Sequence, residues 1–112
     1  MTHPRPLSDA EMMEAAKNLD DEVAYFGDSQ AYYKLYNTSQ CAVFYFYNGE
    51  RSKTLSALFD MTIQNLQIQG EEPGCSQFNV EIGPGKSCYK ILKPIVEGEA
   101  TEIQMRFEFN LN

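Results

Sequence analysis

The last segment of the chain alternates strictly between apolar and polar residues. From residue 102 to residue 111 every odd position is apolar and every even position is polar or charged. Residues 77–82 show the same period, with Phe78, Val80 and Ile82 separated by polar side chains. A period of two indicates a β-strand with one face in a core and one face in water. Both segments are therefore predicted to be half-buried strands.

Two earlier segments are also predicted to be strands. Residues 31–37 alternate less strictly, and residues 41–47 are apolar or aromatic at nearly every position. A strand that is apolar on both faces lies centrally in a sheet or beneath a helix. Asn48-Gly49 is the favoured pair of a type I′ hairpin, so the next strand is expected to run back antiparallel to residues 41–47.

A change of parity marks the next run. Residues 55–63 keep their apolar side chains on one face, whereas Leu66 and Ile68 fall on the other. Such a shift needs a bulge or bend near Gln64-Asn65, where a strand leaves one sheet and enters another. Residues 87–93 form a further predicted strand. Before it, Pro84-Gly85 suits the central positions of a type II turn.

The N-terminal part of the chain has a helical period. Residues 1–7 are a proline-rich polar tail that we expect to be disordered. Ser8 and Glu11 fit a capping box, which predicts the start of a helix over residues 8–27. Its apolar positions recur at spacings of four and three, as on one face of a helix. They are Met12, Ala16, Leu19, Val23 and Phe26, and Gly27 is predicted to end the helix.

Together these elements predict one fold class. Six to eight strands with turn signals about every 10 residues are typical of an antiparallel β-sandwich. We therefore predict a mainly β protein, with a sandwich domain over residues 28–112 preceded by the helix and the tail.

Composition narrows the class of protein. The chain has 112 residues, 43% of them hydrophobic, and a formal net charge of −7. The acidic charge disfavours nucleic acid and anionic lipid as partners, because both attract clustered Lys and Arg. No apolar run is long enough to span a bilayer, and the first residues lack the apolar core of a secretory leader. We expect a reduced, cytoplasmic protein without direct membrane insertion.

Catalytic chemistry is not visible in the sequence. A cysteine nucleophile needs a neighbouring base, but the single histidine, His3, lies in the predicted tail. Cys41 and Cys88 fall in or beside predicted strands, where cysteine usually acts as a small hydrophobic residue. Cys75 falls in a loop and stays a candidate redox thiol. We predict no catalytic residue and no enzymatic activity.

Carboxylates offer only weak signals for metal binding or hydrolysis. Glu71 and Glu72 lie in one predicted loop and Glu97 and Glu99 in another, where calcium binding is an alternative to solvated charge. Asp60 lies within a predicted strand, and a paired or solvent-facing carboxylate is favoured there over a catalytic one. We predict no metal site and no cofactor.

Two features are candidates for binding. Tyrosines crowd two neighbouring predicted strands, and tyrosine is enriched at protein interfaces. The candidates for a binding patch are Tyr32, Tyr36, Tyr45 and Tyr47, with packing in the core as the alternative. The N-terminal helix is the second candidate, since its apolar stripe either covers its own sandwich or docks into a partner. The docking positions would be Met12, Leu19 and Val23.

Four segments between Tyr32 and Phe109 share a recognisable order of aromatic, polar and turn residues. They are Tyr33-Lys34-Leu35-Tyr36-Asn37, Phe44-Tyr45-Phe46-Tyr47-Asn48, Phe59-Asp60-Met61-Thr62 with Asn65-Leu66, and Ile82-Gly83-Pro84-Gly85-Lys86.

On these segments the chain resembles the β-sandwich domain of calpain-related proteins, including small calpain-like proteins of protozoa that lack the protease. The resemblance implies a regulatory or targeting module associated with cytoskeleton or membrane, without protease activity. The lipid-anchored members carry a glycine at position 2, whereas this chain has Thr2. Any membrane association would therefore run through a partner.

The sequence thus favours a non-catalytic interaction module that binds a protein partner. The alternative is a small-ligand or lipid-binding sandwich or barrel with a cavity lined by the tyrosines. A ligand-binding protein is expected to contain such a pocket. An interaction module is expected to have a filled interior and an exposed apolar or aromatic patch.

Overall fold

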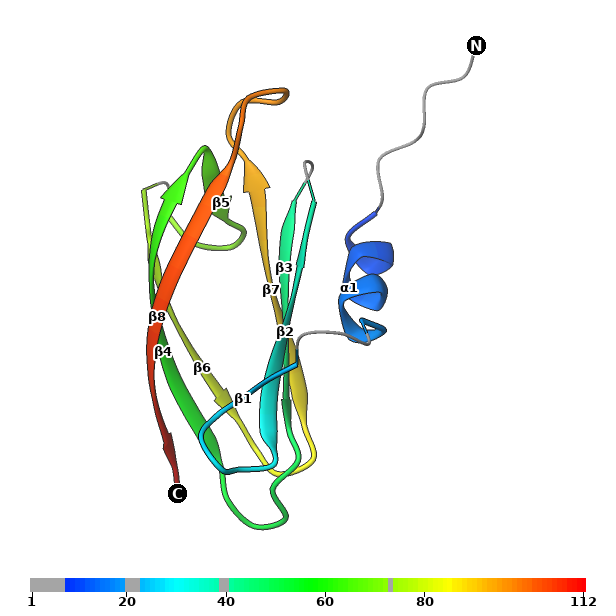
Figure 1. Cartoon of the computed structure of the whole chain (residues 1–112), viewed down its shortest axis with the longest axis vertical. Helices are drawn as coiled ribbons and strands as arrows, with labels where there is room; N and C mark the ends of the chain where they lie inside the picture. Colours follow the sequence, from blue (N-terminus) through cyan, green and yellow to red (C-terminus); the bar gives the residue numbers. More distant parts are fainter. Residues whose placement is uncertain (1–7, 20–22, 39–40, 73) are drawn as a thin grey trace.

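Two antiparallel sheets face each other, and a short helix lies on the outer side of one of them (Figure 1). The computed structural model describes residues 8–19, 23–38, 41–72 and 74–112. Eight strands fall within these ranges, so the predicted β-sandwich with an N-terminal helix is confirmed. The predicted tail, residues 1–7, lies outside the described residues.

Sheet A has the strand order β1-β2-β3-β7-β5, and sheet B has the order β6-β4-β8. The strands of sheet A are β1 (Ala24–Tyr25), β2 (Ala31–Asn37), β3 (Ala42–Asn48), β7 (Ser87–Pro94) and β5 (Leu66–Ile68). The strands of sheet B are β6 (Gln77–Ile82), β4 (Leu55–Gln64) and β8 (Glu102–Leu111).

The alternation of the two C-terminal strands is confirmed. In β6 the residues Phe78, Val80 and Ile82 are buried and their neighbours are exposed. In β8 the apolar positions also point inward, but most of them are only half-buried because β8 lies at the margin of sheet B. The facing of each strand therefore follows from its sequence, whereas the depth of burial follows from its place in the sheet.

The predicted change of sheet occurs at Asn65. This residue has φ of 57°, in the left-handed region that Asn tolerates better than most residues. Its amide nitrogen donates to the carbonyl oxygens of Val96 (2.9 Å) and Glu99 (3.2 Å), and its Oδ1 accepts the Val96 N–H (2.8 Å). These bonds hold the bend between β4 and β5. Leu66 and Ile68 consequently reach the core from sheet A.

The prediction of a hairpin at Asn48-Gly49 is wrong, because β3 and β4 lie in different sheets. Asn48 is fully buried. Its Nδ2 donates to the carbonyl oxygens of Lys53 and Ile82, each at 2.8 Å, and its Oδ1 accepts the Glu50 N–H at 3.0 Å. A tight turn would lose these bonds, so a wider loop connects the two sheets.

The predicted turn at Pro84-Gly85 is confirmed. Gly85 has φ of 73°, as the third residue of a type II turn requires. The Lys86 N–H donates to the Gly83 carbonyl at 3.1 Å and closes the turn. The turn carries the chain from β6 in sheet B to β7 in sheet A.

Aromatic rings fill the space between the sheets. Phe59 of β4 is fully buried, and its ring stacks on Phe78 of β6 and Phe107 of β8 with centroid distances of 5.1 Å. Rings from sheet A contact it from the other side at 5.3–5.9 Å. They belong to Tyr33, Phe44 and Phe46. The interior is therefore an aromatic core.

The N-terminal helix is shorter than predicted. The capping box is present, with Ser8 and Glu11 bonding to each other's backbone N–H, but α1 covers only Asp9–Lys17. The apolar stripe predicted to continue to Phe26 does not form. Instead β1 begins at Ala24, and Phe26 inserts between the sheets, where its ring lies 5.4 Å from Phe107. Complete burial of a Phe ring in the core outweighs the local helical pattern.

Helix α1 packs on the outer face of sheet A (Figure 1). Met12 and Ala16 are buried against Val43 and Tyr45, the outward-facing residues of β3. This packing explains why β3 is apolar on both faces, since one face meets sheet B and the other meets the helix. The predicted position of this strand beneath a helix is confirmed.

Polar contacts also tie α1 to the sandwich. Lys93 Nζ lies 2.8 Å from Asp9 Oδ1, and Gln69 Nε2 donates to Asp9 Oδ2 at 3.1 Å. The hydrogen bond from Lys93, with a smaller effect from Gln69, lowers the pKa of Asp9. The first turn of the helix is thus attached to β7 and to the end of β5.

Candidate interaction surface

Five tyrosines lie together on the outer face of sheet A, beside α1. Residues of one parity in each strand point away from the core, and the strand register brings them side by side. The pairs are Tyr25 with Tyr32, Tyr32 with Tyr47, and Tyr45 with Tyr89. We call the surface formed by Tyr25, Tyr32, Tyr45, Tyr47 and Tyr89 the tyrosine face.

The rings of the tyrosine face contact one another. The centroid of Tyr32 lies 5.6 Å from that of Tyr25, 5.5 Å from Tyr47 and 6.4 Å from Tyr45. Tyr45 lies 5.2 Å from Tyr89. Tilted and edge-on rings at these separations attract each other. The surface is therefore preformed, because each ring restricts the rotation of its neighbours.

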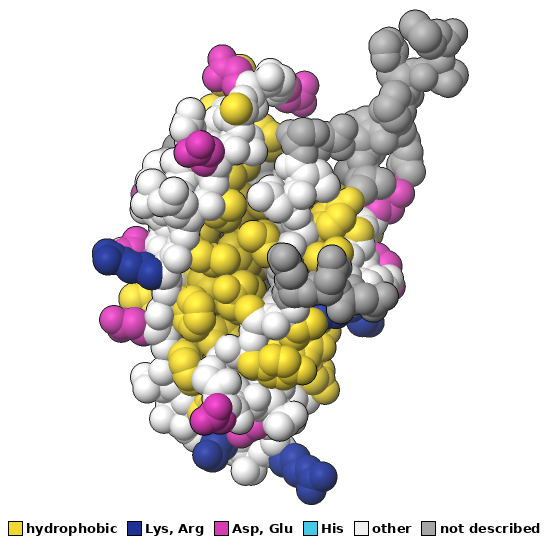
Figure 2. Space-filling model, viewed as in Figure 1, with side chains coloured by type: hydrophobic (Ala, Val, Ile, Leu, Met, Phe, Trp, Pro, Cys, Tyr) yellow, Lys and Arg dark blue, Asp and Glu magenta, His cyan; other side chains and the backbone are white. Residues whose placement is uncertain are grey.

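Exposure varies across the tyrosine face. Tyr25 is 54% exposed, whereas Tyr45 is 5% exposed because it packs beneath α1. Tyr32, Tyr47 and Tyr89 are half-buried. Figure 2 shows hydrophobic side chains on the surface on the same side of the molecule as α1. The helix thus covers one part of the outer face of sheet A and leaves tyrosines accessible next to it.

Tyr36 occupies a different part of the same face. It pairs with Val43 and is packed, half-buried, against the cluster beneath α1. Of the four tyrosines predicted to form a patch, the structure brings Tyr32, Tyr45 and Tyr47 into ring contact and places Tyr36 beside the helix.

Lys34 is a cation at the border of this surface. Its Nζ lies 5.7 Å from the centroid of the Tyr32 ring, within the range of a cation–π interaction. The same Nζ donates a 2.9 Å hydrogen bond to the carbonyl oxygen of Lys17, the last residue of α1. A positive charge is favourable at the C-terminus of a helix. Lys34 therefore links the helix end to the tyrosine face.

Burial raises the pKa of three tyrosines of the tyrosine face. It raises the pKa of Tyr32, and the neighbouring hydroxyls of Tyr45, Tyr47 and Tyr25 raise it further. Burial is also the main cause that raises the pKa of Tyr45 and of Tyr89. At neutral pH the hydroxyls of Tyr32, Tyr45 and Tyr89 stay protonated and can both donate and accept hydrogen bonds. The surface thus combines apolar ring faces with uncharged polar groups.

Alkaline pH is expected to destabilise the fold through these tyrosines. The folded-state pKa values of Tyr32, Tyr45 and Tyr89 lie above 10.0, so the unfolded chain loses these phenolic protons first. The contribution of these tyrosines to the free energy of unfolding is fully present below about pH 10. It is lost as the pH rises through their folded-state pKa values. Tyrosinate absorbance and denaturation midpoints measured against pH check this. Tyr32→Phe should weaken the pH dependence, and an unchanged dependence would contradict the assignment.

The thiols lie apart from one another and have structural surroundings. Cys41 is buried beneath α1, and Cys88 packs against the core. Burial raises the pKa of both thiols, which disfavours the nucleophilic thiolate. Cys75 is half-buried and its Sγ lies 3.1 Å from the carbonyl oxygen of Gln77. His3 lies outside the described residues.

The carboxylates singled out in the sequence are either paired or scattered. Asp60 Oδ2 accepts two hydrogen bonds from Arg106, at 3.1 and 2.9 Å, on the outer face of sheet B. Glu71 lies 4.0 Å from Lys90, and Glu97 and Glu99 are exposed. Within the described ranges no three His, Cys, Asp or Glu side chains lie close enough to hold a metal ion.

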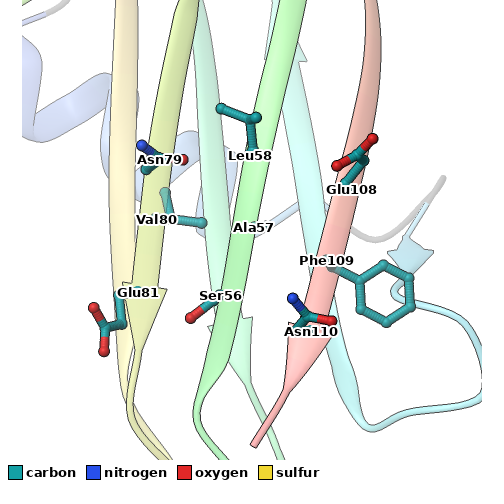
Figure 3. A pocket seen from close by; sticks show the side chains of 9 residues that line it. All are labelled: Ser56, Ala57, Leu58, Asn79, Val80, Glu81, Glu108, Phe109 and Asn110. Carbon is teal, nitrogen blue, oxygen red and sulfur yellow. The ribbon is translucent and has the colours of Figure 1, made fainter.

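A surface depression lies on sheet B, away from the tyrosine face. It measures about 400 Å³ and is lined by side chains of all three strands of that sheet. Figure 3 shows Glu81 and Glu108 on either side of β4, with Leu58 between them and Ser56 nearby. The second depression, about 270 Å³, lies between α1 and β7 and includes Tyr89. Both open on outer surfaces, whereas the space between the sheets is filled by rings.

Of the two roles that the sequence left open for the helical stripe, the structure shows packing on the sandwich of the same chain. Met12 is buried against the sandwich of its own chain, so it is not accessible to a partner. Leu19 and Val23 are half-buried and lie beyond the end of α1. The three positions do not share one helical face, because α1 ends at Lys17.

Sequence reasoning missed Tyr25 and Tyr89. The helical prediction over residues 8–27 concealed Tyr25, although Ala24, Tyr25 and Phe26 also fit an inward–outward–inward strand pattern. Tyr89 lies in a correctly predicted strand, but its contact with Tyr45 requires β3 and β7 to be neighbours. These strands are far apart in the sequence, and no local pattern reports that they pair.

Comparison with protein-family models, curated proteins and solved structures gives no match for this chain. The resemblance to calpain-related sandwich domains therefore stays a prediction. Within the part of the chain that the structure describes, no helix has the length and apolar character to cross a membrane.

Proposed function

We propose that this chain is a non-catalytic interaction module that binds a protein partner through the tyrosine face. The observation that carries the proposal is the connected group of five tyrosine rings on the outer face of sheet A. Tyrosine supplies large contact area with little loss of conformational entropy, and it is enriched among the residues that dominate binding energy.

The arrangement of the face supports this use. Its rings contact one another, burial favours the neutral form of Tyr32 at its centre, and Lys34 provides a cation at its edge. A partner with an apolar or aromatic segment flanked by an acidic residue would complement these groups. We expect Tyr25 to lose the most exposed area when the partner binds, because it is the most exposed ring of the face.

The ligand-binding alternative has less support. A cavity lined by tyrosines would have to lie between the sheets. Phenylalanine rings and Tyr33 fill that space, whereas the four candidate tyrosines of β2 and β3 point to the outer face of sheet A. The proposal also includes the calpain-related character implied by the sequence. A cytoplasmic location with cytoskeletal or membrane association through the partner belongs to the same proposal.

The experiment compares capture of partners by variants of the whole chain. Tyr25→Ala with Tyr47→Ala removes two rings of the tyrosine face, and Ile95→Ala is the matched control. Ile95 is 64% exposed and lies in the loop after β7. Proteins captured from the source cell are quantified, and the affinity of each purified candidate is then measured.

The proposal predicts a partner whose affinity falls by at least about tenfold in the double tyrosine variant, as for loss of a dominant contact residue. The Ile95→Ala chain should bind as the unmodified chain does. If every captured protein binds the tyrosine variant equally well, the tyrosine face is not the binding surface. If both variants lose binding alike, the loss is not specific to this face.

A further inference from the structure

A second surface of the molecule has the properties of a pairing edge. Among the described strands β8 is bonded only to β4, so its other edge is open over its ten residues. The marginal strands of sheet A are much shorter, with two residues in β1 and three in β5. Short marginal strands are one way in which proteins avoid pairing with other chains. β8 lacks this protection.

β8 carries charged side chains only on its solvent face and lacks several other protections of an edge. It contains no proline and no lysine, and its register with β4 runs without a bulge from Glu102 to Leu111. Its inward side chains are all apolar and incompletely covered, with Phe109 36% exposed. Figure 2 shows a long hydrophobic stripe along this open side of the sandwich, and Figure 1 shows β8 beside it.

The hydrogen bonds to β4 determine which groups of β8 point outward. Asn112 and Thr54 exchange both of their backbone hydrogen bonds, at 2.9 and 3.0 Å. In an antiparallel ladder such pairs alternate with pairs whose N–H and C=O groups point to the other side. The residues whose backbone groups point to the open edge are therefore Ile103, Met105, Phe107, Phe109 and Leu111.

We propose that β8 pairs antiparallel with β8 of a second copy of this chain, with the two-fold axis at Phe107. This register uses the whole strand, because Ile103 then lies opposite the partner's Leu111 and Met105 opposite the partner's Phe109. The outward N–H and C=O groups form about ten hydrogen bonds, a number typical of protein interfaces. The half-buried apolar side chains of each copy cover those of the other.

Charge favours this register over its neighbours. On the solvent face Arg106 lies opposite the partner's Glu108, and the symmetry repeats the pair. Gln104 lies opposite the partner's Asn110, so both members of that pair are uncharged. A shift that moves the axis to residue 106 puts Arg106 opposite itself, and a shift to residue 108 puts Glu108 opposite itself. Like charges directly opposite each other destabilise a strand pair.

Arg106 can donate hydrogen bonds to Asp60 and to the partner's Glu108 at the same time. Its side chain is 85% exposed, and only Nε and Nη2 donate to Asp60. A guanidinium group has five N–H donors, so three remain for the partner's Glu108. Asp60 holds the guanidinium over the strand and thereby orients it for the second contact.

The first measurement is the mass of the whole chain in solution by sedimentation over roughly a hundredfold range of concentration. The buffer contains about 0.15 M salt, so that repulsion between two chains of net charge −7 is screened beyond about 8 Å. We expect a concentration-dependent monomer–dimer equilibrium. Hydrogen exchange gives the register, since the amides that point to the open edge should become protected only as the dimer forms. They are those of Ile103, Met105, Phe107, Phe109 and Leu111.

Charge reversal then tests the pairing itself. Arg106→Glu and Glu108→Arg each place like charges opposite each other in a homodimer, so each variant alone should dimerise at least about tenfold more weakly. A mixture of the two variants restores opposite charges at both positions and should form a heterodimer of about the original affinity. Glu81→Arg is the control for Glu108→Arg, because it makes the same change in charge on β6 of the same sheet. It should leave dimerisation unchanged.

The outcomes decide the proposal. Recovery in the mixture supports pairing through β8 in this register, and it cannot be explained by misfolding of either variant. A chain that stays monomeric, with fast exchange of the outward amides at every concentration, overturns the proposal. A dimer that both single variants and the Glu81→Arg control leave unchanged shows that another surface associates, and it overturns the proposal as well.

Discussion

Phe59→Ala is expected to lower the free energy of unfolding by about 3–5 kcal/mol, the range measured for buried aromatic residues. The ring is fully buried and lies between Phe78 and Phe107, with three further rings of sheet A against it. Its removal would leave a cavity between two sheets, and the strands cannot close it without disturbing their hydrogen bonds. Chemical denaturation with two probes measures the change.

Leu58→Ala is the control for this prediction. Leu58 is the preceding residue of β4, points to the outer face of sheet B and is 36% exposed. Its truncation should cost less than about 1 kcal/mol, because little buried surface is lost. Equal losses for the two variants would contradict the facing of β4 and, with it, the registers of sheet B.

Asn48→Ala is expected to cost about 2–4 kcal/mol, since it removes a fully buried side chain that bonds one buried and two partly buried backbone groups. The Asn48 side chain bonds the carbonyl oxygens of Lys53 and Ile82 and the N–H of Glu50. Among the described residues no buried side-chain nitrogen or oxygen lacks a hydrogen-bond partner, so the unpaired groups of the variant would stand out. The denaturation midpoint of the variant measures the cost.

A second substitution at Asn48 and a control on the surface test this prediction further. Asn48→Asp keeps the shape but loses the amide donor and adds a buried charge, so it should be at least as destabilising as Asn48→Ala. Asn79→Ala removes an exposed amide from β6 and should change stability by less than about 0.5 kcal/mol. Tolerance of Asn48→Asp would mean that the donated hydrogen bonds do not hold the loop between β3 and β4.

Local patterns predicted the strands well because each side chain reports its own environment. The alternation in residues 77–82 and 102–111 indicated which residues face the core, and the change of parity at Asn65 indicated the crossing between sheets. The type II turn at Pro84-Gly85 also depends on residues adjacent in the sequence.

The errors occurred where a distant contact outweighs a local preference. Asn48-Gly49 favours a hairpin, but the buried Asn48 side chain bonds groups up to 34 positions away. Residues 18–26 continue a helical period, but Phe26 gains more by packing with Phe107, far along the chain. In both cases the deciding partner lies in another element, so no window of sequence contains it.

The tyrosine face was also predictable only in part. The crowding of tyrosines in two neighbouring predicted strands indicated a patch with Tyr32 and Tyr47 among its candidates. Tyr25 and Tyr89 join that patch only through the pairing of β1 with β2 and of β3 with β7.

The sequence by itself determined the fold class, the facing of the long strands and the point at which the chain changes sheets, because these depend on periodicity and on residues adjacent in the chain. The tertiary structure alone decided the end of the helix, the neighbours of each strand, the tyrosines that meet on sheet A and the open edge of β8. Those features depend on which surfaces compete most successfully for burial, and that competition is settled between residues distant in the sequence.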